Sequence, residues 1–191
     1  MNHDEIRRIH GEALALFGTR VHAVRDDQWD APTPCTDWPV RALVNHLTAE
    51  QLWVPRLVRD GAAITDVGAD YDGEVLGDDP AAAWDRAAVA AVAAFAERGT
   101  LDRPVQLSYG AVPAAGYCTQ MTADAVVHTW DLSRAIGADE RLPGPLATAA
   151  LREVEPYAPG LAASGLFAPA VEAPADADDL TRLLCLLGRQ P

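Results

Sequence analysis

The stretch Met121–Gly137, MTADAVVHTWDLSRAIG, decides the fold class that we expect. If it is helical, Asp124 and His128 stand one turn apart, about 6 Å along the axis, and point the same way. Asp131 lies nearly two turns beyond Asp124 and shares that face. Gly137 is a typical C-terminal stop for a helix. The sequence therefore predicts a helix that presents a carboxylate and an imidazole able to bind one divalent cation together.

The composition is typical of a globular protein with a large core and an acidic surface. The 191 residues are 49% hydrophobic, and no apolar run approaches the ~18 residues that would indicate a membrane span. Asp and Glu number 28 against 15 basic residues, all of them Arg, and the formal net charge is −13. Such a charge repels phosphate backbones and anionic lipids, so we expect neither nucleic acid nor a membrane as a partner.

The N-terminus and the cysteines indicate a reducing compartment. The start, MNHDEIRRIH, has no apolar segment of the kind found in secretory signals. Cys35, Cys118 and Cys185 are widely spaced and form no CxxC pair, which is typical of reduced, structural thiols. We predict a cytoplasmic protein.

A second helix is predicted from Asp37 to about Asp60, with Asp37 as its N-cap and Pro39 in its first turn. His46 lies in the middle of this helix among apolar residues, and Glu50 follows one turn later. If this helix faces the one described above, His46 can join Asp124 and His128.

The remaining pattern predicts more helices and one long connection. The first helix is expected from residue 3 to about 26. His3 and His10 are one heptad apart, and we interpret them as surface residues rather than as a site, and His22 as a surface or partly buried residue. The Gly/Asp-rich segment 61–79 is long enough to cross between two parallel helices. Further helices are expected at 80–98, with Asp79 as the N-cap, at 114–136, at 145–157 and, after a Pro/Ala-rich segment, at 178–188, with an extended piece at 105–108.

These elements predict an all-α fold, a four-helix bundle with a long crossover between helices 2 and 3 and short extra C-terminal helices. We expect residues 1–191 to form a single metal-binding domain, of which 145–191 is a small helical appendage.

Inward-facing His and carboxylate residues on facing helices are how bundles build metal sites. Two histidines and one carboxylate, His46, Asp124 and His128, leave one coordination position open, which is the arrangement of catalytic zinc. From spacing alone, a lone His in the middle of a helix, such as His46, is more often a hydrogen-bonded core residue, and a carboxylate four residues before a His is a frequent chance pattern.

Glu50 and Asp131 have alternative interpretations. Glu50 is a candidate general base, a partner that orients His46, or a surface carboxylate. Asp131 either orients the site or pairs with Arg134 three residues later. We assign no chemical role to Cys35.

Two stretches, TPCTDWPVRALVNHL (33–47) and VVHTWDLSRAIG (126–137), resemble the signatures of the mycothiol-dependent maleylpyruvate isomerase-like proteins, which belong to the DinB-like superfamily. The ending, LFAPAVEAPADADDLTRLLCLLGRQP (166–191), is similar to the tail of an actinobacterial branch whose members are mostly of undefined activity. The resemblance extends over nearly the whole chain.

The resemblance implies a DinB-like four-helix bundle with a divalent metal, usually zinc or nickel, at one end. Its ligands, a His and an E-x-x-x-H pair, correspond to His46, Asp124 and His128. This chain has Asp where the isomerase pattern has Glu, so the side chain is one methylene shorter. The metal would then bind more weakly, lie nearer the helix, or recruit Glu50 or Asp131.

Our leading hypothesis is a metal-dependent enzyme that uses mycothiol to transfer a thiol to, or isomerise, a small electrophilic substrate, with Glu50 in proton transfer. Alternatives are a metal-dependent hydrolase and a non-catalytic metal- or ligand-binding bundle. The expected partners are the electrophile and the thiol, and the sequence is compatible with a homodimer.

Overall fold

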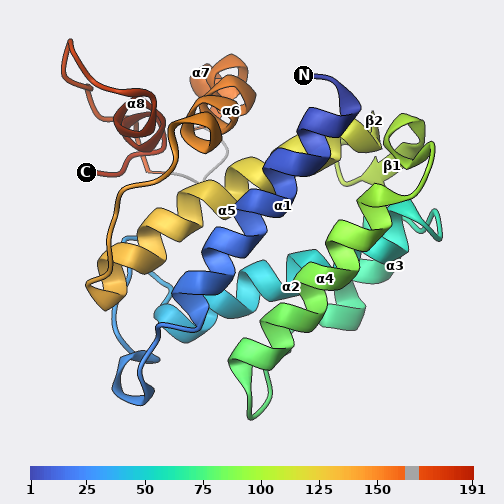
Figure 1. The fold of residues 1–191 in the computed structure, drawn as a ribbon, viewed down its shortest axis with the longest axis horizontal. Coiled ribbons are helices and arrows are strands. Elements are labelled where there is room, and N and C mark those ends of the chain that lie inside the picture. Colours follow the sequence, from blue (N-terminus) through green and yellow to red (C-terminus); the bar gives the residue numbers. More distant parts are fainter. Residues whose placement is uncertain (162–167) are drawn as a thin grey trace.

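Long helices form the body of the protein, which the computed structural model describes over residues 1–161 and 168–191. Their apolar residues recur at helical spacing and are buried on the inner faces. Figure 1 shows two of these helices running side by side in one direction and the other two running in the opposite direction. The all-α four-helix prediction is confirmed for α1 (His3–Val21), α2 (Val40–Val58), α4 (Pro80–Ala96) and α5 (Ala114–Ile136).

Short elements connect and cover the bundle. A two-stranded antiparallel hairpin precedes α5 and pairs Pro104 with Pro113. Its strands and the remaining described elements are η1 (Asp26–Gln28), α3 (Ile64–Val67), η2 (Gly68–Tyr71), η3 (Thr100–Asp102), β1 (Pro104–Leu107), β2 (Gly110–Pro113), α6 (Gly144–Val154), η4 (Glu155–Tyr157), α7 (Ala158–Leu161) and α8 (Asp179–Leu186).

The connection between α2 and α4 is the predicted crossover. It brings the chain back to the other end of the bundle, so that α2 and α4 run parallel (Figure 1). The Asn45 side chain holds the returning segment by donating to the Gly73 carbonyl (2.7 Å) and accepting from the Val75 amide (2.8 Å). Arg41 adds an ion pair to Glu74 at 3.0 Å. The crossover is therefore tied to α2 along its return.

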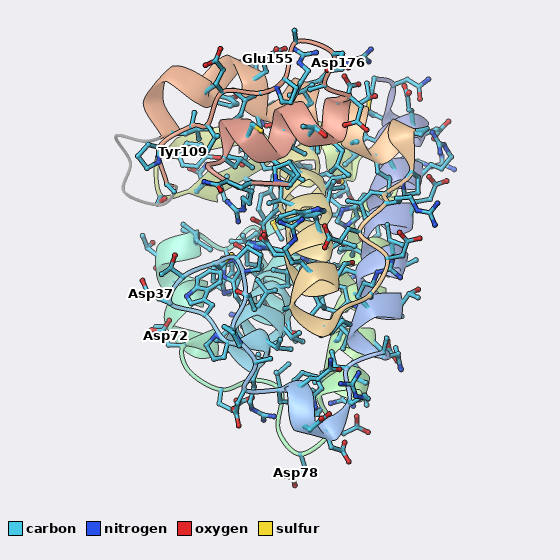
Figure 2. All side chains as sticks on the ribbon, turned by 90° about the vertical axis from the view of Figure 1, so that its left-hand side faces the viewer. Asp37, Asp72, Asp78, Tyr109, Glu155 and Asp176 are labelled. Atoms are coloured by element: carbon cyan, nitrogen blue, oxygen red, sulfur yellow. The ribbon has the colours of Figure 1, made fainter. Side chains whose placement is uncertain are left out.

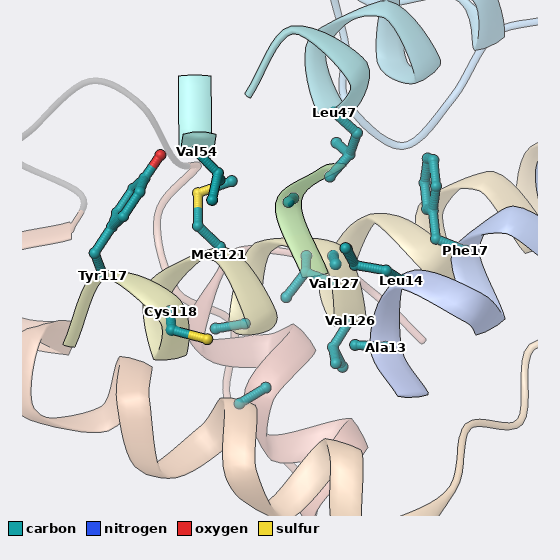
Figure 3. Close-up of a cluster of buried hydrophobic side chains, with 14 of the residues drawn as sticks. Ala13, Leu14, Phe17, Leu47, Val54, Tyr117, Cys118, Met121, Val126 and Val127 are labelled. Atoms are coloured by element: carbon teal, nitrogen blue, oxygen red, sulfur yellow. The ribbon is translucent and has the colours of Figure 1, made fainter. Parts of the chain in front are cut away.

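The core lies between the long helices, and Figure 3 shows part of it. The Phe17 ring meets Trp84 of α4 with 4.6 Å between ring centroids. Buried side chains from three of the helices fill the space between them: Ala13, Leu14, Phe17, Leu47, Val54, Tyr117, Cys118, Met121, Val126 and Val127.

Two predicted helix ends were wrong. The second helix begins at Val40 with Pro39 as its N-cap, because residues 37–39 belong to the preceding loop, where the Val40 amide donates to the Ala31 carbonyl (3.0 Å). The first helix ends at Val21 rather than near residue 26. A separate 3-10 turn follows, in which the Gln28 side chain accepts from the Arg25 amide at 3.1 Å.

The prediction that His10 lies at the surface was also wrong. His10 is 1% exposed and sits 3.2 Å from the Thr122 hydroxyl and edge-on to Phe95. It follows Ile6 by one turn and so shares the apolar stripe of α1. Burial lowers its pKa to about 4. His22, in contrast, is exposed, with Nε2 3.0 Å from Asp85.

The C-terminal elements lie against the bundle. α6 packs on α5, and α8 packs on α6. Gly137 ends α5 in the left-handed conformation (φ 69°), as predicted. The Pro/Ala-rich segment predicted before Asp178 includes residues 162–167, which lie outside the described residues, as do the first two residues of the tail that carries the family resemblance. Within the described ranges, no helix combines the length and apolarity needed to cross a bilayer.

Candidate metal centre

Three predicted ligands meet where α2 faces α5. His46 projects from the middle of α2, and Asp124 and His128 stand one turn apart on α5. Asp124 Oδ2 lies 3.7 Å from His46 Nε2, and Asp124 Oδ1 lies 3.5 Å from His128 Nε2. One ligand atom from each of the three residues falls within 4.8 Å of the others. The structure thus brings together the residues that the sequence singled out.

The donor set fits a small divalent cation. Ligand atoms about 2.05 Å from a tetrahedral zinc lie about 3.3 Å apart, close to the distances found here. Asp124 Oδ2 is buried, and the Glu50 carboxyl, when protonated, lies within hydrogen-bond reach of the Asp124 carboxylate. Two carboxyl groups buried this close together cannot both be ionised without cost, and a cation between the three side chains would remove that cost.

Asp131 orients His128 for this task. Its Oδ2 lies 2.9 Å from His128 Nδ1, which leaves Nε2 directed at Asp124. Although burial opposes both shifts, the Asp124 charge and this hydrogen bond raise the pKa of His128, and the bonds from His128 and Arg189 lower the pKa of Asp131. A carboxylate on the far nitrogen of a ligating His is the usual support of metal sites.

The predicted pairing of Asp131 with Arg134 is not what the structure shows. The Arg134 guanidinium instead binds Glu140 at 2.7 Å and lies over the Trp130 ring. The other interpretation of Asp131, a residue that orients the site, agrees with the geometry.

Glu50 lies beside the three ligands. Its Oε1 is 3.6 Å from His46 Nε2, its Oε2 is buried, and a protonated Glu50 carboxyl can hydrogen-bond to Asp124. Burial and the neighbouring Asp124 raise the pKa of Glu50 well above its ordinary range. Burial also lowers the pKa of His46, against the opposing effect of Asp124. Glu50 is therefore placed to hold or release a proton at the centre.

A second cluster adjoins the first and was missed by the sequence analysis. Cys35 Sγ lies 3.3 Å from Asp131 Oδ2, and Arg189 Nη2 lies 2.8 Å from the same oxygen and 3.3 Å from the sulfur. Cys35, His128 and Asp131 also satisfy the spacing of a metal site. A guanidinium among these atoms repels a cation, so the first cluster is the better candidate.

The sequence signals for Cys35 and Arg189 differ. Cys35 stands in the Cys-x-x-Trp loop of the stretch that carries the family resemblance, which could have marked it. Arg189 follows α8 in the ending that resembles the actinobacterial branch, but no spacing pattern marks it as a site residue. Only the packing of α8 on α6 brings it to the site.

The candidate centre opens into a cavity of about 650 Å³, which we call the polar chamber. Trp38 stands against the His46 ring, with 4.4 Å between centroids. Much of its wall consists of polar side chains: Thr36, Asp37, His46, Glu50, Asp124, His128 and Arg189.

Fold and site together define a helical bundle with a candidate metal centre between two of its long helices. The chain belongs to the family of the mycothiol maleylpyruvate isomerase N-terminal domain, a DinB-like family, which matches residues 10–133. The matched range includes the three candidate ligands and Glu50, and the family resemblance inferred from the sequence is confirmed.

Two similar proteins are themselves uncharacterized. They are Rv0738 of Mycobacterium tuberculosis strain H37Rv and MT0763 of strain CDC 1551 / Oshkosh. Each is 32% identical over 128 residues, which cover 67% of this chain and 65% of the relative. No solved structure matches the chain significantly.

Proposed function

We propose that this chain is a divalent-metal-binding protein that uses a low-molecular-weight thiol, mycothiol, to modify a small electrophile by S-transfer or isomerisation. The single observation that supports it most is the Asp124 carboxylate, with one buried oxygen, between two imidazoles from facing helices. Membership of a mycothiol-related family supports the choice of thiol.

Different residues of the protein would have separate roles in this reaction. His46, Asp124 and His128 would hold the metal, with zinc favoured by the two nitrogens and one oxygen and nickel as the alternative. Asp131 would keep the His128 ring in register through the Nδ1 hydrogen bond. A divalent cation bound there would supply one thing, the deprotonation of a coordinated thiol.

Glu50 would move the proton. Its carboxyl lies 3.6 Å from His46 Nε2, within reach of a group that enters the open side of the centre. Trp38 beside His46 would limit the access of water there. No protein cysteine is required as nucleophile, although Cys35 lies near enough to deserve a control.

Cobalt(II) substitution tests the thiol step, because cobalt–sulfur bonding gives a near-ultraviolet absorption that zinc lacks. We expect mycothiol to add that absorption to the cobalt-loaded protein, and Cys35→Ala to keep it. His46→Ala should abolish it, while His22→Ala, a change at an exposed His with a carboxylate partner, should not.

An unchanged cobalt spectrum at saturating mycothiol would contradict the thiol proposal. Turnover of an electrophilic ester without added thiol would favour the hydrolase alternative. If the protein retains no metal, the remaining alternative is a non-catalytic ligand-binding bundle.

A further inference from the structure

A second cavity adjoins the candidate metal centre. It has a volume of about 490 Å³, within the range of small-molecule sites. Its floor is a stripe of α5 with helical spacing, Gln120, Ala123, Asp124, Val127 and His128. The Asp124 and His128 side chains also line the polar chamber, so the two cavities meet at the candidate ligands.

The walls of this second cavity, the apolar chamber, differ in chemistry from those of the first. Val112 of β2 and Tyr109 of the hairpin turn stand on one side, and Val154 and Tyr157 stand on the other. The Tyr109 hydroxyl is already used, because it donates to Gln120 Oε1 at 2.5 Å. Aromatic rings with apolar neighbours favour an apolar, planar ligand.

The charged residues that line the apolar chamber exclude an anionic ligand. Among the described residues that line the apolar chamber, Arg189 is the only Lys or Arg. Its three guanidinium nitrogens already donate, two to Asp131 and one to the Leu187 carbonyl. Glu153 and Asp124 add negative charge to the walls. A carboxylate or other anionic group on a ligand would therefore be buried without a partner, which is costly.

We infer that the apolar chamber binds an uncharged, aromatic or otherwise apolar small molecule, with its end at Asp124 and His128. The polar chamber is then left for a hydrophilic co-ligand. Binding in the apolar chamber does not depend on a metal. Only the identification of this ligand with the electrophile rests on the proposed function.

A pair of fluorescent probes tests the inference. N-phenyl-1-naphthylamine is uncharged, and 8-anilinonaphthalene-1-sulfonate carries the same two aromatic groups with one negative charge. We expect one N-phenyl-1-naphthylamine site per chain, with at least tenfold weaker binding of the sulfonate. Val112→Trp should fill the chamber and weaken the uncharged probe at least tenfold.

Matched variants keep the test falsifiable. Val89→Trp makes the same change at a residue of α4 that is 70% exposed and should leave probe binding unchanged. Gln120→Trp, from the floor of the chamber, replaces Val112→Trp if that variant does not fold. Equal binding of the two probes, or binding that neither chamber variant weakens, would overturn the inference.

The same titration separates this inference from the proposed function. If the chamber exists but the metal site does not, metal-free protein and His46→Ala still bind the uncharged probe. If the metal site exists but the chamber does not, the protein retains metal and binds no probe.

Discussion

The state of a single buried residue in this protein depends on the groups that its side chain faces. His128 and His10 are both buried histidines that lie across helix interfaces, yet their environments are opposite. His128 faces Asp124 and Asp131, and these carboxylates raise its pKa despite burial. His10 faces a threonine and a phenylalanine, and burial alone lowers its pKa. Burial favours the neutral ring in both cases, and a neighbouring carboxylate therefore decides whether a buried histidine is charged or neutral.

The depressed pKa of His10 predicts a loss of stability in acid. Between about pH 4 and 6.5 the unfolded chain binds a proton at this residue and the folded chain does not, so the free energy of unfolding falls as pH falls. The full difference is about 3 kcal/mol. Urea unfolding of His10→Asn at pH 7 and pH 5 should show a smaller pH dependence than the parent.

His22→Asn is the matched control for that measurement, because it removes an exposed imidazole that directly follows α1 and lies beside Asp85. This variant should keep the loss of stability in acid. If His10→Asn also follows the parent, His10 does not stay neutral in the folded protein between these pH values.

At the scale of elements, α1 and α4 approach each other closely at Gly18. A Cβ added at Gly18 would stand 2.8 Å from Trp84 Nε1. Trp84 is 1% exposed and is held against Phe17, so it has little room to yield. Gly11, on the same helix, has open space at the corresponding position.

Alanine at these two glycines should therefore act in opposite directions. Gly11→Ala should stabilise the protein by up to about 1 kcal/mol, which is the difference in helix propensity. Gly18→Ala should destabilise it by about 1–3 kcal/mol, because overpacking exceeds that gain. Thermal unfolding of both variants checks the pair; two changes of the same sign would contradict the close approach at Gly18.

The elements also show what the sequence could and could not predict. Caps and stops were readable where a side chain or a glycine acts locally, as at Asp79, which accepts from the Ala82 amide, and at Gly137. Pro39 was misjudged because the start of this helix depends on the Val40 amide, which donates to the Ala31 carbonyl nine residues earlier. Arg189 lies 58 residues from Asp131, and no periodic pattern connects them.

At the scale of the whole molecule, an acidic exterior surrounds a site in which carboxylates lie beside nitrogen side chains. Figure 2 shows Asp37, Asp72, Asp78, Glu155 and Asp176 at the periphery of the molecule. Within the site, the carboxylates of Asp124 and Asp131 face one guanidinium and two imidazoles. A net charge of −13 favours the approach of a divalent cation from solution. The cytoplasmic location and the single-domain organisation stay predictions.

The metal content of the purified protein tests the central claim most directly. Elemental analysis of untagged protein, beside His46→Ala, His128→Ala and the control His22→Ala, separates the candidate site from other histidines. We expect about one zinc or nickel per chain in the parent and in His22→Ala, and loss of that metal in the other two. A parent that holds no metal even after reconstitution, or variants that all retain it, would contradict a centre built on these residues.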